Sequence, residues 1–226
     1  MRTPMLAKRF VGRALGPPIT KRASARCDKR EGLSDPDSGR VPIACPRDRR
    51  DAGGMPNYRR VWVPGGTYFF TVNLLERRRR LLVERADDLR ASFRAAQAAR
   101  PFEMLAIVVL PDHLHCIWRL PADDADNANR WAHIKAGFSR RLPRDEWRSE
   151  RRVSCRERGV WQRRYWEHLI RDDDDLRRHV DYIHWNPVKH GHASRAADWP
   201  YSSFRRWAAA GAYPLDWAMP PPSGSA

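Results

Sequence analysis

Two strand-forming segments lie only two residues apart in the middle of this chain. Residues 102–110 and 113–120 are rich in aliphatic and aromatic side chains, and Pro111-Asp112 between them is a typical turn pair. A connection this short can join antiparallel neighbours, whereas parallel strands need a crossover of about a dozen residues or more. The sequence therefore predicts a β-hairpin, and with it an antiparallel sheet.

Strand and helix patterns alternate on both sides of this hairpin. The expected strands cover 66–75 and 160–170, and the expected helices cover 84–100, 127–142 and 172–185, the last of them ended by Asn186-Pro187. The resulting order of elements is that of a ferredoxin-like split βαβ unit with one added helix. We therefore expect the α+β class, with a ferredoxin-like antiparallel sheet and helices on one face.

The two ends of the chain differ in composition from the part between them. Residues 1–54 carry 13 Lys+Arg against 6 Asp+Glu and few apolar clusters. This predicts a disordered basic arm, and a translation start at Met55 is an equally good interpretation. Residues 211–226 end in a Pro- and Ser-rich stretch and are expected to be a flexible tail. The single domain is therefore expected over 55–210.

The chain is strongly basic, with a formal net charge of +16. An excess of this size favours a polyanionic partner, either nucleic acid or, less strongly, an anionic membrane surface. Arg greatly outnumbers Lys, which a GC-rich genome would also produce. The charge alone therefore favours nucleic-acid binding without establishing it.

Two classes of protein are disfavoured by the distribution of apolar and cysteine residues. No stretch approaches the roughly 18 apolar residues of a transmembrane helix, so we expect no membrane partner. The four cysteines are scattered and form no CxxC pair. This argues against a zinc ribbon or a disulfide framework, and for a protein of the reducing cytosol.

The clearest candidate ligands are His113 and His115 in the second strand of the hairpin. Residues i and i+2 of a strand face the same side, roughly 6–7 Å apart, so two imidazoles can bind one divalent ion. The alternative is a pair of partly exposed strand histidines without a ligand role.

A second candidate pair, Tyr182 and Asn186, lies at the end of the last expected helix. Residues four apart share a helical face, so a phenol and an amide would point to the same site. A tyrosine hydroxyl can act as a covalent nucleophile, and an amide oxygen is a hard ligand suited to Mg²⁺. The alternative is a buried tyrosine packed on the sheet and an asparagine that ends the helix before Pro187.

Basic residues are interleaved with aromatic residues along the chain. Basic side chains bind phosphates, and aromatic rings stack on unpaired bases. The alternative is a set of core aromatics surrounded by solvated arginines. The candidate DNA-binding residues are Arg77, Arg78, Arg79, Arg80, Lys135, Arg140, Arg141, Arg163 and Arg164. The aromatic residues are Trp161, Tyr165, Trp166, Trp185, Trp199, Tyr201 and Phe204.

Four segments, taken in order, resemble a known family. They read LPDHLH at 110–115, WQRRYWEH at 161–168, DYIHWNPVKHG at 181–191 and DWPYSSF at 198–204. This combination is similar to the REP-associated tyrosine transposases, a branch of the single-tyrosine HUH transposases of insertion sequences. The resemblance covers about 55–207 and implies the HUH transposase fold.

The resemblance also implies an activity and a set of roles. Members bind single-stranded DNA carrying palindromes folded as hairpins, nick it through a 5′-phosphotyrosine and rejoin the ends. By this likeness Tyr182 is the nucleophile, and His113, His115 and Asn186 hold Mg²⁺ or Mn²⁺, although many relatives have Gln where Asn186 stands. We expect a monomer or homodimer acting on the nucleoid of a bacterial cytoplasm.

Three other functions stay open on the sequence alone. A non-catalytic DNA-hairpin binding protein or repressor could keep the fold without cleaving. A zinc hydrolase would need a third histidine or a carboxylate as ligand. An RNA-binding ferredoxin-like module would need paired aromatics on its central strands, where this chain has His113 and His115.

Overall fold

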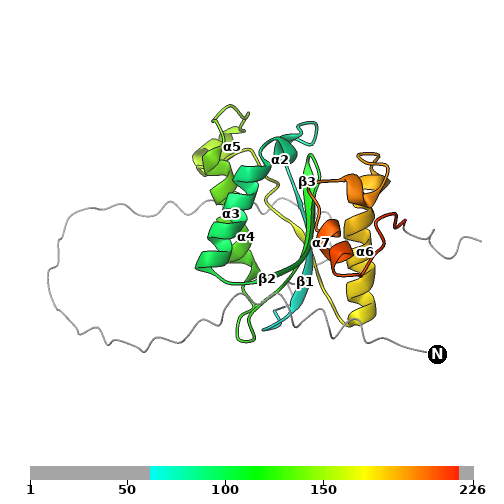
Figure 1. Cartoon of the computed structure of the whole chain (residues 1–226). Coiled ribbons are helices and arrows are strands. Elements are labelled where there is room, and N and C mark those ends of the chain that lie inside the picture. The colour runs from blue at the N-terminus through cyan, green and yellow to red at the C-terminus, as the bar shows by residue number, and fades with distance from the viewer. Residues whose placement is uncertain (1–61, 219–226) are drawn as a thin grey trace, which may run out of the picture. The chain divides into compact units, whose positions relative to one another are not determined.

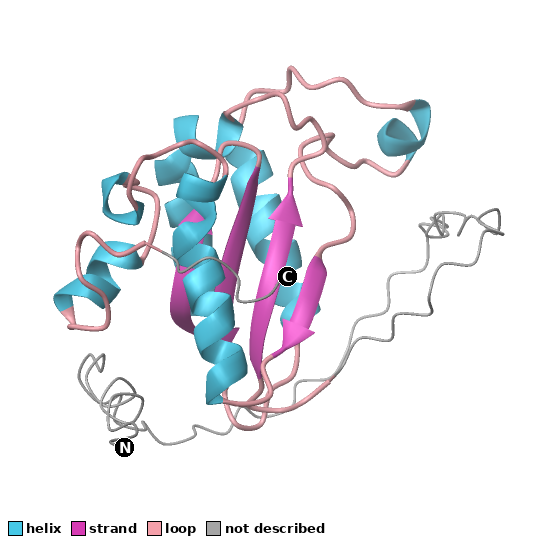
Figure 2. Cartoon of the chain, turned by 90° about the vertical axis from the view of Figure 1, so that its right-hand side faces the viewer, coloured by secondary structure: helices cyan, strands magenta, loops and turns pink. Residues whose placement is uncertain are grey.

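The computed structural model describes residues 62–218, so the predicted arm over 1–54 lies outside the described residues. Four antiparallel strands form one sheet in the order β2-β3-β1-β4 (Figures 1 and 2). The strands are β1 (Thr67–Asn73), β2 (Glu103–Val109), β3 (His113–Arg119) and β4 (Trp166–Leu169). This strand order and direction are those of a ferredoxin-like split βαβ unit, and the predicted fold class is confirmed.

Helices cover both faces of the sheet. In Figure 1, α3 (Ala86–Ala99) and α4 (Asn127–Arg141) lie on one side, and α6 (Asp173–Lys189) lies on the other. The two helices of the split βαβ unit share a face as expected, but the expectation that helices cover one face alone is wrong, because the added helix α6 covers the opposite face. Figure 2 looks at the sheet from the α6 side. Within residues 62–218, no helix combines the length and apolar character needed to cross a membrane.

Four short helical segments complete the described part of the chain. They are α2 (Leu81–Glu84), α5 (Glu150–Ser154), the 3₁₀ turn η1 (Ala196–Asp198) and α7 (Phe204–Ala209). The sequence patterns did not predict them, because segments of three to six residues are too short to show a helical period.

β3 is buried along almost its whole length, and its side chains alternate between two cores. Leu114 and Trp118 pack under α3 and α4, whereas Ile117 belongs to the core beneath α6. Since successive strand residues point to opposite faces, His113 and His115 share the face of Ile117. The central strand therefore directs both histidines toward α6.

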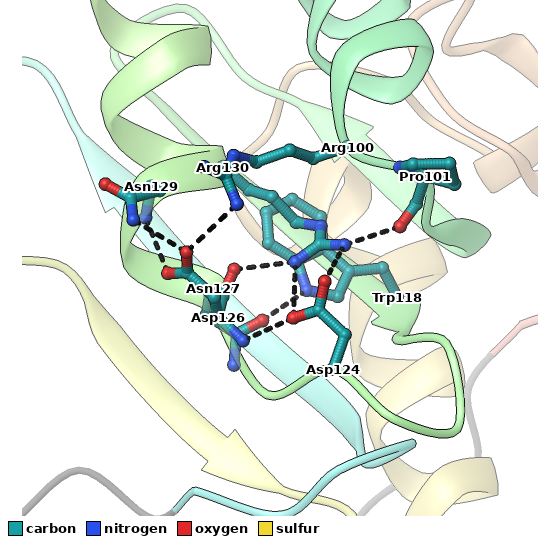
Figure 3. A network of polar contacts seen from close by, with 8 residues as sticks. All are labelled: Arg100, Pro101, Trp118, Asp124, Asp126, Asn127, Asn129 and Arg130. Carbon is teal, nitrogen blue, oxygen red and sulfur yellow. Dashed lines mark hydrogen bonds and ion pairs between the residues drawn. The ribbon is translucent and has the colours of Figure 1, made fainter. Parts of the chain in front are cut away.

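A buried arginine on α4 ties the loop before this helix to the end of α3 (Figure 3). Arg130 is completely buried, and its two terminal nitrogens donate to the two carboxylate oxygens of Asp124 at 3.0 and 2.8 Å. The same nitrogens donate to the carbonyl oxygens of Asp126 and Pro101, both at 2.7 Å. A charge this deeply buried needs partners such as these four acceptors, so the network fixes the two helices relative to one another.

The strand expected over 160–170 is interrupted. Its first part makes only a bridge between Leu74 and Trp161, and regular pairing with β1 begins at Trp166. Between these points the ammonium of Lys135 donates hydrogen bonds to the carbonyl oxygens of Gln162, at 2.8 Å, and of Arg163. Those carbonyls are therefore bound to a side chain, which leaves β4 with only four residues.

The prediction that Asn186-Pro187 ends the last long helix is wrong. α6 continues through Pro187 to Lys189. Beyond the proline the chain recovers backbone hydrogen bonds, from His190 to the carbonyl of Asn186 at 3.1 Å and from His192 to that of Pro187 at 2.8 Å. Asn186 and Pro187 are both buried, so tertiary packing offsets the one helical hydrogen bond that proline cannot make.

Residues 211–217, predicted as part of a flexible tail, pack against the domain. Tyr213 donates a hydrogen bond to the carboxylate of Asp181 on α6. Its ring lies 4.8 Å from that of Trp217, and Phe204 of α7 contacts both rings. The packed domain therefore extends past residue 210 at least to Trp217.

Candidate active site

β3 and α6 bring together the residues that the sequence singles out. His113 and His115 lie on the face of β3 that α6 covers, with 5.0 Å between their ring centroids. The ring of Tyr182 on α6 is 5.2 Å from that of His115, centroid to centroid. Asn186 follows one helical turn later and is completely buried. The contact between β3 and α6 is therefore the candidate site.

Each histidine is oriented by a hydrogen bond to one ring nitrogen. Nδ1 of His113 lies 2.7 Å from a carboxylate oxygen of Asp112, and Nδ1 of His115 lies 2.9 Å from the hydroxyl of Thr71. Partners of this kind fix the ring orientation of metal-binding histidines. With Nδ1 engaged in both rings, Nε2 is the nitrogen that remains to bind a ligand.

The electrostatic environment keeps His115 neutral. Burial, followed by the positive charges of His113, His190 and Lys189, lowers the pKa of His115 to about 3. Burial works against ionisation of Asp112, but its hydrogen bonds with His113 and Arg77 outweigh this and lower the pKa of the carboxyl. At neutral pH, His115 therefore has an uncharged ring available for a cation, beside a group that stays anionic.

Two buried polar atoms at this site have no hydrogen-bond partner. They are Nε2 of His115 and Oδ1 of Asn186. The amide nitrogen of Asn186 donates to the carbonyl of Tyr182 at 3.1 Å, which fixes the assignment of its oxygen. An unsatisfied buried polar atom costs about 1–3 kcal/mol, so two of them near one another favour a ligand. Two imidazole nitrogens and an amide oxygen form a donor set that fits a divalent metal ion.

The phenol of Tyr182 lies in an aromatic and cationic environment. Phe69 packs against the rings of both Tyr182 and His115, at centroid distances of 6.1 and 5.5 Å. The ammonium of Lys189, two turns along α6, lies 5.1 Å from the centroid of the Tyr182 ring. A cation over the face of an aromatic ring is attracted to it, so this contact helps to hold the Tyr182 ring in place.

A basic cleft of about 300 Å³ opens beside His113. Its lining contains the four consecutive arginines 77–80 and the histidines His190 and His192. Arg77 is paired with Asp112, with 2.6 Å between Nε and the carboxylate oxygen. A concave surface with this charge is suited to a phosphate chain that leads up to His113.

His190 and His192 are site residues that the sequence pattern did not identify. The ring of His190 lies 5.6 Å from that of His113, and His192 stacks on Trp199 at 5.4 Å. Burial first, and then neighbouring positive charges, lower the pKa of both imidazoles. The sequence signal for His190 was its spacing of four residues from Asn186. This spacing places both residues on one helical face only if the helix continues through Pro187.

The basic residues predicted on α4 do not join this site. Lys135, Arg140 and Arg141 lie on the helix that covers the other face of the sheet. Lys135 binds the carbonyl of Gln162, and Arg141 binds that of Gly137, both at 2.8 Å. Arg140 is exposed. These residues belong to a second surface of the domain.

The last two predicted DNA-binding residues precede β4. Arg163 and Arg164 are both exposed, and Arg163 is paired with Glu157 at 2.9 Å. Because β4 is an edge strand next to β1, these arginines lie beside the β4 edge of the sheet.

A cluster of two histidines and an aspartate lies beside the candidate site. Ligand atoms of His168, Asp175 and His179 all lie within 4.8 Å of one another. Burial opposes ionisation of Asp175, but the hydrogen bonds from His168 and the backbone of Arg171, with the charges of both histidines, lower its pKa to about 2. The carboxylate holds both imidazoles, at 2.8 and 3.1 Å.

Comparisons with known proteins give consistent results. No family model matches the chain. The chain is 46% identical over 168 residues to a Haemophilus influenzae protein assigned provisionally to the REP-associated tyrosine transposases, covering 74% of this chain and 96% of that one. It is 47% identical over 164 residues to the REP-associated tyrosine transposase of Escherichia coli K12, covering 73% and 92%. A solved structure of a REP-associated tyrosine transposase bound to a REP hairpin has 46% identity and a TM-score of 0.63, covering 74% and 93%.

Proposed function

The chain belongs to the REP-associated tyrosine transposases, and we propose that Tyr182 cleaves single-stranded DNA beside a REP hairpin and that the ends are later rejoined. The family is one of HUH single-tyrosine transposases, so the chain is an enzyme of DNA strand transfer. The observation that carries the assignment of Tyr182 is its ring contact with His115, one turn away from the buried amide of Asn186.

We propose that Nε2 of His113, Nε2 of His115 and Oδ1 of Asn186 hold Mg²⁺ or Mn²⁺. The two orphaned atoms, on His115 and Asn186, support this assignment. When bound there, such an ion would supply Lewis-acid chemistry to the scissile phosphate. Neutral ligands leave the full charge of the ion available to the phosphate, and the low pKa of His115 keeps that ligand neutral at physiological pH.

In this proposal the covalent step is an in-line displacement at phosphorus. The hydroxyl oxygen of Tyr182 forms the new bond to phosphorus, the bond to the 3′ oxygen of the preceding nucleotide breaks, and that oxygen leaves as a 3′-hydroxyl with a proton. An ordinary tyrosine has a pKa near 10, so the phenol must be activated for this step. Attack of a second 3′-hydroxyl on the phosphotyrosine reverses the step and joins new ends.

The basic cleft beside His113 would hold the backbone of the strand being cut. Arginines 77–80 supply positive charge along one side, and His190 and His192 supply hydrogen-bonding groups on the other. The exposed Arg140 and its neighbours on α4 would contact a different part of the folded DNA, because α4 lies on the opposite face of the sheet. The REP hairpin bound to the relative supports a hairpin as the partner.

The cellular setting follows from the substrate. A protein that acts on chromosomal palindromes works where the chromosome lies, which in a bacterium is the cytoplasm and its nucleoid. We propose that the chain acts there as a monomer or homodimer.

A gel assay for covalent protein–DNA adducts tests the proposed function. Oligonucleotides that carry a hairpin and a single-stranded flank are incubated with the full-length protein and Mg²⁺ or Mn²⁺, and the products are separated under denaturing conditions. We expect an adduct that forms with wild type and is absent with Tyr182→Phe. Hairpin binding without any adduct would leave a non-catalytic hairpin-binding protein, which is the alternative function.

A further inference from the structure

Trp166 lies in one row with the candidate active site. On the sheet, Trp166 of β4 is opposite Thr71 of β1, and Thr71 is opposite His115 of β3. Directly opposed residues point to the same face, and adjacent strands lie about 4.8 Å apart, so Trp166 is roughly 10 Å from His115 along the sheet. The row ends at β4, which is the sheet edge.

The tryptophan is exposed, unlike the tryptophans of the core. Trp166 keeps 50% of its surface open, whereas Trp118 and Trp131 keep at most 1%. A large aromatic ring exposed to this extent beside a reaction site is typical of ligand binding. Within residues 62–218, the aromatic rings that contact Trp166 are those of Phe69, at 5.6 Å, and His168.

A column of parallel rings holds the indole in place. The rings of Trp166 and His168 are 5.9 Å apart and only 4° from parallel, and His168 stacks on His179 at 4.6 Å. Asp175 bonds to both imidazoles, at 2.8 and 3.1 Å, and so fixes the end of the column. The indole is therefore preorganised, and the open part of the residue is free to extend the stack.

The same supporting residues connect Trp166 to the nucleophile. Phe69 contacts the rings of Trp166, His179 and Tyr182, at 5.6, 4.8 and 6.1 Å. His179 and Tyr182 are three residues apart on α6 and lie on one helical face. A ligand stacked on Trp166 would thus be positioned by the groups that also position the phenol.

We propose that Trp166 stacks on an unpaired base of the substrate strand next to the scissile phosphate and thereby places that phosphate before Tyr182. This inference rests on the proposed function and adds a base-binding site to it. The exposed Arg163 and Arg164, three and two residues earlier, supply the charge that a nucleic acid needs. A base is favoured over a protein partner because the net charge of +16 attracts polyanions and because every base has a face to stack.

Binding and cleavage are compared for wild type, Trp166→Ala, Trp166→Phe and the control Trp147→Ala. Trp147 is 78% exposed and lies in the loop before α5. Because stacking on one base contributes measurably to affinity, we expect Trp166→Ala to bind the flanked hairpin about 5- to 100-fold more weakly than wild type. The hairpin without its flank should bind all four proteins alike, and Trp166→Phe should retain most of the affinity.

A scan of abasic sites locates the base and does not depend on the folding of a variant. Single bases of the flank are removed one at a time, and wild type should lose affinity most at one or two positions beside the cleavage site. Those positions should have little further effect in Trp166→Ala, because both changes remove the same contact. Equal behaviour of Trp166→Ala and Trp147→Ala, or additive effects at every abasic position, would overturn the proposal.

The same reactions separate this inference from the proposed function. If wild type forms the covalent adduct but the abasic scan shows no coupling to Trp166, only the stacking site is wrong. If wild type forms no adduct while the coupling is present, the base-binding site stands and the cleavage mechanism fails.

Discussion

The ring of Tyr182 stands edge-on to the imidazole of His115, with 5.2 Å between centroids and 70° between the ring planes. One residue comes from α6 and the other from the central strand β3, 67 positions apart in the chain. This contact places the candidate nucleophile beside a candidate metal ligand. Because the two residues lie on different elements, the role of the nucleophile and the role of the metal ligands can be tested by separate substitutions.

Tyr182→Phe should abolish nicking and adduct formation while hairpin affinity stays within about twofold of wild type. The substitution removes only the hydroxyl and leaves the ring packed against Phe69 and His115. Tyr201→Phe is the matched control, since this tyrosine packs against Trp199 away from the metal ligands. Cleavage by Tyr182→Phe at the wild-type rate would exclude Tyr182 as the nucleophile.

Asn186→Leu should abolish cleavage without lowering the stability of the metal-free protein. The change to an apolar side chain of similar size removes the cost of the buried, unsatisfied oxygen and also the hydrogen bond from the amide nitrogen to the carbonyl of Tyr182, and these two effects roughly offset one another. Wild type should gain thermal stability with Mg²⁺ or Mn²⁺, since an ion that binds only the folded state shifts unfolding by mass action. This gain should be smaller in the variant and should disappear with a chelator. Equal stabilisation of both proteins by the metal would argue that Asn186 is not a ligand.

Stability should fall as the pH drops from about 6.5 toward 3. Burial lowers the pKa of His115 and of His184 to about 3, in His115 with help from nearby positive charges and in His184 from Arg206. In this window the unfolded chain binds protons that the folded protein does not, so unfolding becomes easier at lower pH. Each of these two histidines should lower the free energy of unfolding by about 2 kcal/mol at pH 5 relative to pH 8, as an order of magnitude.

Denaturant unfolding of His184→Gln between pH 8 and pH 5 measures this contribution. Nε2 of His184 lies 3.0 Å from the hydroxyl of Ser203, a partner that a glutamine amide can also bind. The variant should lose part of the pH dependence and cleave DNA normally, because His184 packs against α7 and the C-terminal segment, away from Tyr182. An unchanged pH profile would show that His184 titrates alike in both states.

Local signals explain which elements the sequence predicts well. The hairpin follows from the Pro111-Asp112 turn, and α4 begins at its predicted residue and ends one residue early. Asp126 caps that helix by accepting from the backbone of Asn129 at 3.0 Å, and Pro143 follows its end. Turn, cap and stop residues act within a few positions, so they can be recognised without knowledge of the fold.

The sequence-based predictions that were wrong or missing concern features fixed by contacts between distant segments. The strand expected from residue 160 is shortened because the ammonium of Lys135, on α4, donates hydrogen bonds to two of its carbonyl oxygens. Because Pro187 is buried, α6 continues about one turn beyond the end that the Asn186-Pro187 pair predicts. This extra turn places His190 beside His113. The column of His168, His179 and Trp166 likewise needs β4 and α6 to pack together, which no spacing in the sequence reveals.

Arg130→Met should destabilise the domain by about 3–5 kcal/mol, as expected when one partner of a buried ion pair is removed. Its guanidinium is completely buried and holds both oxygens of Asp124 together with two backbone carbonyls. Asp124 is partly exposed, so Asp124→Asn should cost less. Denaturant unfolding measures both. A loss below 1 kcal/mol for Arg130→Met would show that the network adds little to stability.

Arg78→Ala combined with Arg80→Ala should weaken hairpin binding and reduce its dependence on salt. Each phosphate contact adds about one to the slope of log affinity against log salt, so losing two should lower that slope by up to two. Arg77 and Arg79 are ion-paired with acidic side chains, and their removal would also expose those acids. Arg94→Ala on α3 is the control, since it is exposed on the opposite face of the sheet.

Arg140→Ala in the same titration tests whether the hairpin also reaches α4. A reduced salt slope would mean that the folded DNA also contacts α4, which covers the face of the sheet opposite α6. A response equal to that of Arg94→Ala would confine the DNA to the side of the sheet that carries Tyr182. If the doubly substituted cleft variant also matched this control, the four arginines would not form the phosphate-binding surface, and the strand would have to approach His113 by another route.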